Sequence, residues 1–246
     1  MQAHIYLRDE HKAKYVLLPG DHKRLDVIKT FLDDVKELAF NREYRSISGY
    51  YKGVKILALS SGMGGTSTAI AIEELKNIGV EAIIRIGSCG ALQSNIRLGD
   101  LIIANGAVRD DGTSKAYMDS IFPAVPDTEL LFDVIESAKE LNVKNHVGIV
   151  RSHDSFYTDD TPMLDDLWSS RGVLGADMET STLFVVSSVR RLKSASILNN
   201  VVEYGQKAED GVSNYENGDE AVSNGEKNEI LVALEAFIKM ENRRSK

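Results

Sequence analysis

Short apolar runs alternate with amphipathic stretches along most of the chain. The apolar runs have the length and composition of buried strands and cover residues 15–18, 54–59, 82–86, 100–104, 147–150 and 195–202. Between them, apolar residues recur at helical spacing over residues 23–38, 67–78, 132–141, 178–190 and 228–240. Strand, turn and helix in repeated alternation predict an α/β fold, a three-layer sandwich around a central, mostly parallel mixed β-sheet.

We expect a single domain over residues 1–246. The chain contains four prolines, no Ser/Gly-rich linker and no internal repeat at a fixed period. One segment, residues 205–227, is polar and rich in Gly, Asn, Asp and Glu. This composition predicts a mobile loop or lid rather than a domain boundary.

Charge and cysteine content narrow the class of protein. The formal net charge of −8 argues against a nucleic-acid binder with a basic face, although a few arginines in one pocket can still bind a small anion. A single cysteine, Cys89, excludes an intramolecular disulfide and favours a reducing compartment. No apolar stretch approaches the ~20 residues of a membrane span, and no signal-peptide pattern opens the sequence. We therefore expect a cytoplasmic protein without nucleic-acid or membrane partners.

Three glycine-containing loops follow predicted strands, at residues 19–24, 60–67 and 85–90. Ligands of open α/β sheets collect at the carboxyl ends of strands, and backbone amides beside glycines suit anions. Arg85 interrupts an apolar strand, and a buried arginine needs an anionic partner. A ligand or a structural carboxylate would satisfy it equally well. None of the loops matches the phosphate-binding Walker pattern or the dinucleotide fingerprint.

Six short motifs occur in a fixed order. They are Pro19-Gly20-Asp21 with Arg24, Asn41-Arg42-Glu43-Tyr44, Gly62-Met63-Gly64-Gly65, Arg85-Ile86-Gly87-Ser88-Cys89-Gly90, Phe122-Pro123-Ala124-Val125 and Asp177-Met178-Glu179. Together they resemble the nucleoside phosphorylase-I family, which contains uridine phosphorylases and hexameric purine nucleoside phosphorylases. The resemblance extends from His4 to the last helix. It implies a pentosyltransferase that uses inorganic phosphate as co-substrate, without a cofactor, to split a nucleoside into free base and (deoxy)ribose 1-phosphate.

The resemblance also implies roles for individual residues. Phosphate would be bound by Gly20, Arg24, Arg85 and Ser88, together with Arg42 of a neighbouring subunit. Ribose would be bound by Met178 and Glu179, together with His4 of the adjacent subunit. Arg24, Arg85 and Glu179 would carry the catalysis. Because His4 and Arg42 would act across an interface, the minimal active unit is expected to be a dimer, assembled further into a hexamer.

The base pocket departs from both branches of the family. Phe156 and Tyr157 are placed to stack on a planar base, but residues 158–162 lack the Gln and Arg that follow in uridine-specific members. Val202 occupies the position of the Asp that protonates the base in purine-specific members. Glu203, Glu209 or Asp210 are candidate replacements for that acid.

Residues 108–115 and 122–125 look more like the uridine branch, so a uridine phosphorylase-like enzyme is predicted. The alternatives are a purine nucleoside phosphorylase with an atypical base pocket and a nucleoside-sensing protein without turnover. A related hydrolase is a further reading, but water as nucleophile would not require three arginines.

Other candidate chemistry is weaker. Cys89 is not expected to be a nucleophile, because phosphate already fills that role. The five histidines show no metal-ligand spacing, so no metal site is expected. Glu43 and Ser67 resemble positions that hold a monovalent cation at the dimer interface of some uridine phosphorylases, which implies a possible K⁺ site.

Overall fold

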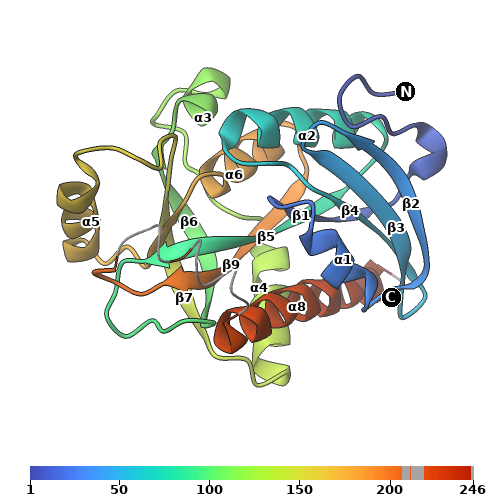
Figure 1. Cartoon of the computed structure of the whole chain (residues 1–246). Coiled ribbons are helices and arrows are strands. Elements are labelled where there is room, and N and C mark those ends of the chain that lie inside the picture. Colours follow the sequence, from blue (N-terminus) through green and yellow to red (C-terminus); the bar gives the residue numbers. More distant parts are fainter. Residues whose placement is uncertain (207–210, 212–218, 245–246) are drawn as a thin grey trace.

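Nine strands form one mixed sheet at the centre of the molecule (Figure 1). The computed structural model describes residues 1–206, 211 and 219–244. The strands are β1 Tyr15–Pro19, β2 Asp33–Asn41, β3 Tyr44–Tyr51, β4 Val54–Leu59, β5 Ala82–Ala91, β6 Leu101–Asp110, β7 Asn145–His153, β8 Gly175–Asp177 and β9 Lys193–Val202. Their order is β2-β3-β4-β1-β5-β8-β7-β6-β9, and β5 also pairs with β9. The pairs β1–β4, β1–β5, β5–β9, β6–β7 and β7–β8 are parallel and the others antiparallel, which confirms the predicted mixed sheet.

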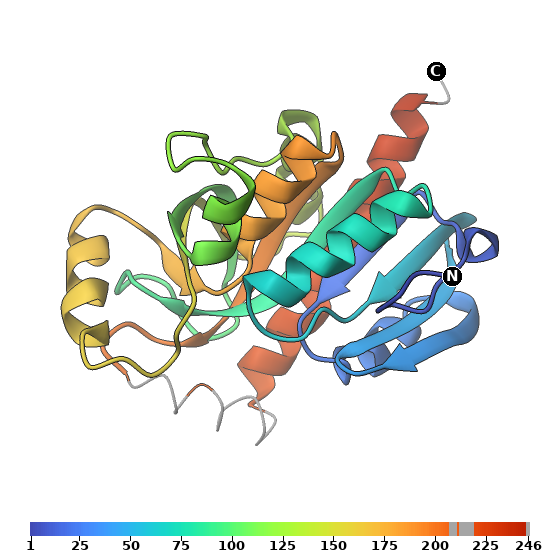
Figure 2. The ribbon, with the colours of Figure 1, turned by 90° about the horizontal axis from the view of Figure 1, so that it is seen from above.

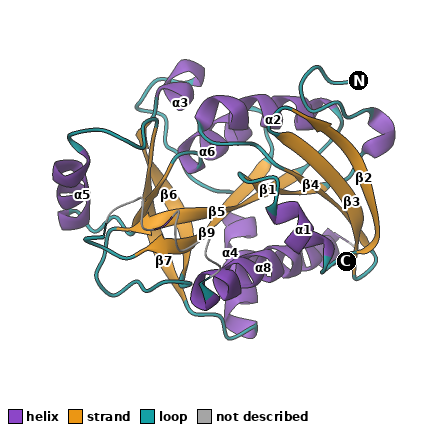
Figure 3. Cartoon of the chain, in the orientation of Figure 1, coloured by secondary structure: helices purple, strands orange, loops and turns teal. Residues whose placement is uncertain are grey.

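Helices cover both faces of this sheet (Figures 2 and 3). They are the short 3-10 helix η1 Asp9–His11 and the α-helices α1 Arg24–Lys29, α2 Gly65–Asn77, α3 Gly112–Tyr117, α4 Thr128–Glu140, α5 Thr161–Ser170, α6 Thr180–Val189 and α8 Glu220–Arg244. Side chains of a buried strand alternate between the faces. Val16 and Leu18 pack with residues of α2 and α6, whereas Tyr15 and Leu17 pack with residues of α1, α4 and α8. One core lies on each face of the sheet, so the molecule has the three predicted layers: helices, sheet and helices.

The prediction of one helix over residues 23–38 is wrong beyond residue 29. α1 ends there, and Thr30 Oγ1 donates to the Val27 carbonyl at 2.7 Å. The chain then enters β2, which pairs with β3 across the two-residue turn Arg42–Glu43. Ladder bonds to β3 satisfy one edge of the β2 backbone, and this tertiary partner overrides the helical spacing of the sequence.

The C-terminal helix begins earlier than predicted. α8 starts at Glu220, so residues 220–227, expected to belong to a loop or lid, are helical. The rest of the expected lid after residue 206, apart from residue 211, lies outside the described residues. The sequence pattern also missed α3 and β8, which are short, α5, which has no buried residues, and β3, which is mostly buried but interrupted by polar residues and a glycine. In the part of the chain that the structure describes, no helix is long and apolar enough to span a membrane.

Candidate active site

The parallel pair β1–β5 brings two of the predicted loops together. Pro19 at the end of β1 lies opposite Ile86 of β5. Arg24, in the first turn of α1, reaches β5: Nη1 donates to the Ile86 carbonyl and Nη2 to Ser88 Oγ, both at 3.1 Å. Arg24 is only 3% exposed. Of the predicted phosphate-binding residues, Arg24 and Ser88 are therefore in direct contact.

Gly20 lies against the second glycine loop. The Gly62 amide donates to the Gly20 carbonyl at 2.9 Å, and a Cβ on Gly20 would lie 3.2 Å from the Gly62 carbonyl oxygen. Gly62 itself has φ +71°, and a Cβ there would lie 2.8 Å from the Cβ of Glu43. Glycine is required at residue 62 because both its conformation and the close approach exclude a side chain.

Arg85 occupies the opposite face of β5 from Arg24. Side chains two residues apart in a strand lie on the same face, so Arg85 shares with Ile83 the face that α2 and α6 cover. Ile86 lies on the other face, which α8 covers. Arg85 Nε donates to Asp177 Oδ2 at 3.1 Å and Nη2 to Glu179 Oε2 at 2.5 Å. The sequence left open a structural carboxylate or a ligand as the partner of Arg85, and the structure supplies two carboxylates. Nη1 is buried and has no hydrogen-bond partner among the described residues, so this guanidinium retains a donor for a further acceptor.

Glu179 is a buried and well-bonded carboxylate, not a solvated residue at a helix start. Its Oε1 accepts from the Gly64 amide at 2.6 Å and its Oε2 from the Met178 amide at 3.3 Å. Burial raises the pKa of Glu179, although Arg85 opposes the rise. The adjacent Asp177 accepts from Thr180 and Ser152 as well as from Arg85. This dense network fixes the carboxylate that the sequence assigned to ribose.

Two site residues were missed by the sequence reading. Glu226 Oε1 lies 3.3 Å from Arg24 Nε, and Glu229 Oε1 lies 3.0 Å from Arg24 Nη1. Both come from α8 and are buried. They share the inward face of that helix with Ile230 and Ala233 at spacings of three and four residues. Two carboxylates on an apolar helical stripe are the signal that would have identified them.

The residues expected to act across an interface lie at the edge of the chain. Arg42 is exposed at the tip of the β2–β3 hairpin, with φ +56°. His4 Nδ1 lies 2.7 Å from Glu74 Oε1, and the Asn41 side chain donates to the His4 carbonyl at 2.8 Å. His4 is thus anchored on α2 and β2 rather than frayed.

The predicted cation residues lie on either side of the glycine loop 62–65. The Glu43 side chain packs against Gly62, and Ser67 Oγ donates to the Met63 and Gly64 carbonyls at 3.2 and 3.3 Å. Tyr44 donates to the Ser67 carbonyl at 2.9 Å. Among the described residues, no group of three or more His, Cys, Asp or Glu side chains is arranged to hold a metal ion.

The predicted base residues come from two different segments. Phe156 and Tyr157, between β7 and α5, form an edge-to-face pair with ring centroids 4.9 Å apart, and Tyr157 is 72% exposed. Val202 ends β9 opposite Gly90 of β5 and packs with Val201 and Val222.

Of the three candidate replacement acids, only Glu203 lies among the described residues. Glu203 Oε1 lies 3.5 Å from Nη1 of the exposed Arg97. Glu209 and Asp210 lie outside the described residues. Burial raises the pKa of the Cys89 thiol well above its usual range, so this side chain stays protonated.

A cavity of about 560 Å³ lies beside Glu179, whose neighbours Met178 and Gly64 line it. Its lining residues are Met63, Gly64, Gly65, Thr66, Gly112, Thr113, Ala116, Asp154 and Met178. Met178 precedes Glu179 in the chain, and the Gly64 amide donates to the Glu179 carboxylate. A cavity of this size is within the range of small-molecule sites.

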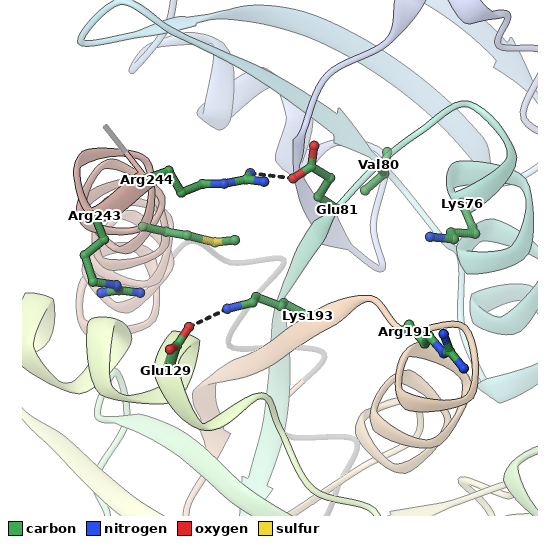
Figure 4. A pocket seen from close by; sticks show the side chains of 9 residues that line it. Lys76, Val80, Glu81, Glu129, Arg191, Lys193, Arg243 and Arg244 are labelled. Carbon is green, nitrogen blue, oxygen red and sulfur yellow. Dashed lines mark hydrogen bonds and ion pairs between the residues drawn. The ribbon is translucent and has the colours of Figure 1, made fainter. Parts of the chain in front are cut away.

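A second cavity, of about 540 Å³, lies at the other end of the strands. Its lining residues are Lys76, Val80, Glu81, Glu129, Arg191, Lys193, Met240, Arg243 and Arg244. Arg244 pairs with Glu81, and Lys193 pairs with Glu129 at 2.5 Å (Figure 4). Val80 and Lys193 lie where β5 and β9 begin. Because ligands of such sheets bind at the carboxyl ends of strands, the first cavity is the candidate site.

Comparisons with known proteins point to one family. The family model for the phosphorylase superfamily matches residues 14–239. The chain is 44% identical to the uridine phosphorylase of Thermococcus kodakarensis, over 80% of this chain and 76% of that protein. It is 36% identical to the guanosine phosphorylase of Halorubrum lacusprofundi, over 85% and 88% of the two chains. A crystal structure of uridine phosphorylase from Vibrio fischeri, complexed with 6-hydroxy-1-naphthoic acid, superimposes with a TM-score of 0.91 at 47% identity, over 97% and 96% of the two chains.

Proposed function

Because the chain belongs to the phosphorylase superfamily, we propose that it is a nucleoside phosphorylase of the uridine phosphorylase type. This pentosyltransferase forms a bond between a phosphate oxygen and C1′ of the nucleoside and breaks the bond between C1′ and the base. The products are the free base and (deoxy)ribose 1-phosphate. The observation that carries the proposal is the pair of buried guanidinium groups, Arg24 and Arg85, which approach the end of β5 from its two faces.

Phosphate binds between these two groups. Arg24 and Ser88 are already joined by a hydrogen bond, and the buried Nη1 of Arg85 is a donor without a partner among the described residues. Charge-assisted bonds from guanidinium groups are strong and directional, and the backbone of Gly20 completes the cradle. Fixing phosphate in this way aligns the nucleophile with the ribose carbon.

Ribose binds at Glu179 and Met178. The Glu179 carboxylate accepts from two backbone amides and from Arg85, and its oxygens retain capacity for further bonds from sugar hydroxyls. The Met178 side chain lines the cavity against which the sugar packs. As the bond to the base breaks, positive charge grows on the ribose ring. The buried carboxylate of Glu179 stabilises that charge.

Val202 supports a pyrimidine as the leaving base. A purine leaves more readily when an acid protonates its ring nitrogen, and a valine cannot supply a proton. Uracil delocalises the electron pair of the broken bond over its two carbonyl groups, while Phe156 and Tyr157 stack on the ring. The relatives from Halorubrum lacusprofundi and Plasmodium vivax, named guanosine and purine nucleoside phosphorylase, keep a purine nucleoside as the second candidate substrate.

A second subunit completes each site. Arg42 at the exposed hairpin tip reaches the phosphate of a neighbouring chain, and His4 reaches its ribose. The minimal active unit is a dimer, and dimers assemble into a hexamer. A monovalent cation such as K⁺ binds near Glu43 and Ser67 and stiffens this contact. The enzyme works in the cytoplasm, where the single thiol of Cys89 stays reduced.

The test is a panel of nucleosides. The purified protein is incubated with uridine, thymidine, inosine, guanosine and adenosine, with and without phosphate, and free base is measured by chromatography. We expect release of uracil that depends on phosphate. Release of a purine base would assign the second candidate, cleavage without phosphate would indicate a hydrolase, and binding without turnover a sensing protein.

A further inference from the structure

The two guanidinium groups lie among more carboxyl groups than they can neutralise. Besides Arg24 and Arg85, this charge cluster contains Asp177, Glu179, Glu226 and Glu229. With every member ionised, two positive and four negative charges leave a net charge of −2. A phosphate dianion that enters such a cluster is repelled, unless one of the carboxyl groups takes up a proton.

Glu229 is the carboxyl group best suited to take up that proton. Its side chain is fully buried, and its Oε1 lies 3.0 Å from Arg24 Nη1. Asp177 and Glu179 each accept hydrogen bonds from backbone amides and from Arg85, and these bonds favour their ionised forms. The Gly87 amide acts on Glu229 in the same direction, but burial outweighs it. Burial raises the pKa of Glu229 to about 8, with Glu226 adding to the rise and Arg24 opposing it.

The groups that face Glu229 come from several elements. Arg24 approaches from α1, Arg85 and the thiol of Cys89 from β5, and Glu226 from the preceding turn of α8. Asp21 acts in turn on Glu226. Asp133 of α4 binds Arg243, and Tyr15 of β1 binds Glu241. Both partners lie in the C-terminal half of α8, away from Glu229.

We infer that phosphate binding at Arg24 is coupled to protonation of Glu229, which takes a proton from solvent when the dianion enters and returns it when the dianion leaves. In its ionised form, Glu229 competes with phosphate for Arg24. In its neutral form, it holds the guanidinium in place without opposing the substrate. Glu229 is therefore a positioning residue that acts through Arg24. This inference rests on the proposed function, since it concerns the same phosphate site.

The test is calorimetric titration of the intact protein with inorganic phosphate, without nucleoside, between pH 7.5 and pH 9.5. The second ionisation of phosphate is completed in the lower part of this range, so a change in affinity in its upper part, between pH 8.5 and pH 9.5, reports on the protein. We expect phosphate affinity to fall about tenfold per pH unit well above the pKa of Glu229. Titrations in two buffers of different ionisation enthalpy should show uptake of up to one proton per phosphate bound.

Two variants on the same helix sharpen the test. Glu229→Gln should bind phosphate with nearly the same affinity at all pH values, and at least tenfold more tightly than the unsubstituted protein at pH 9.5. Glu235→Gln makes the same chemical change at a carboxyl group that binds Tyr51 and Lys52, away from the site, and should keep the pH dependence. A merely structural Glu229 would change affinity by the same factor at every pH, which would overturn the inference.

The unsubstituted protein alone also decides the matter if Glu229→Gln fails to fold. Phosphate binding without proton uptake would overturn the coupling and leave the proposed function standing. No phosphate binding at any pH would overturn both.

Discussion

At the scale of single residues, Arg85 shows what a sequence can and cannot reveal. An arginine within an apolar strand indicated a buried charge and an anionic partner. Its carboxylate partners, Asp177 and Glu179, are more than 90 positions away along the chain, so residue spacing alone could not identify them. Their motif was recognised, but the contact that joins them to Arg85 is a property of the folded sheet.

The substitution Gly87→Ala, which adds one methyl group, tests whether the position of the Arg85 side chain matters for activity. In Gly87→Ala the new Cβ would lie 2.5 Å from Arg85 Nη2, so the guanidinium must move away from its partners. Loss of one charge-assisted hydrogen bond, worth about 1.5–3 kcal/mol, should lower kcat/KM for phosphate by roughly 10- to 150-fold. The thermal midpoint should fall as well, because Arg85 is buried and the displaced guanidinium loses part of its pairing with two buried carboxylates. Steady-state kinetics with varied phosphate measures the effect.

Gly106→Ala is the matched control for this variant. It also adds a Cβ to a strand glycine, but its nearest neighbour is the Ala124 carbonyl oxygen at 3.7 Å, an ordinary contact. It should retain the original kcat/KM. Full activity of Gly87→Ala would show that the observed position of Arg85 is unimportant for turnover.

At the scale of elements, strands that are buried on both faces were predicted best. β1 is a continuous apolar run, β4 and β5 contain the apolar runs 56–59 and 82–84, and β9 is buried along almost its whole length; buried runs of this length have few alternatives. β2 was taken for a helix because Leu32 and Val35 continue the spacing of α1, and only its pairing with β3 makes it a strand. The first turns of α8, residues 220–227, were missed because their sequence is polar although Glu226 within them is buried.

Buried glutamates make the stability of the protein depend on pH. Burial raises the pKa of Glu226, of Glu229 and of Glu179 above 4.5, to about 8 for Glu229. Between pH 4.5 and 8 the folded chain therefore binds more protons than the unfolded chain. Stability is highest at the acid end of this window and is lost as the pH rises, by up to about 1.4 kcal/mol per pH unit for each proton.

Thermal unfolding between pH 5 and 8 measures this loss. We expect the midpoint to fall as the pH rises, and Glu229→Gln to reduce the slope. Glu235→Gln is the control, because the pKa of Glu235 is lowered and its contribution changes only below pH 4.5. A slope that survives unchanged in Glu229→Gln would mean that Glu229 is ionised throughout the window.

At the scale of the whole molecule, the predicted site includes two residues, Arg42 and His4, that are expected from a second chain. The predicted phosphate and ribose residues lie at the carboxyl ends of the central strands. The β2–β3 hairpin that carries Arg42 lies at the opposite end of the molecule from α5 (Figures 1 and 2), with its Glu43 packed against Gly62. Nothing in the spacing of residues along one chain indicates that a second chain takes part. That expectation came from family resemblance alone, so it needs an experiment that distinguishes one chain from two.

Mixing two inactive variants provides that experiment. Arg42→Ala keeps Arg24, Arg85 and Glu179 but lacks the arginine offered to its neighbour, and Glu179→Gln lacks the ribose carboxylate but keeps Arg42. In a mixed dimer, one of the two sites combines only intact residues. Random exchange makes about half of the dimers mixed, so about a quarter of the original activity should return if the pairing is symmetric.

A second pair of variants shows whether recovered activity reports shared sites. Arg85→Gln and Glu179→Gln both damage the site within their own chain, since these side chains are in direct contact, so mixing them should restore nothing. If Arg42 served its own chain, the pair Arg42→Ala and Glu179→Gln would also stay inactive, because every site would then carry one defect. Recovery in the first mixture but not in the second requires Arg42 to cross between subunits. The exposure of Arg42 at the hairpin tip of a single chain would then reflect its role in the site of the neighbouring chain.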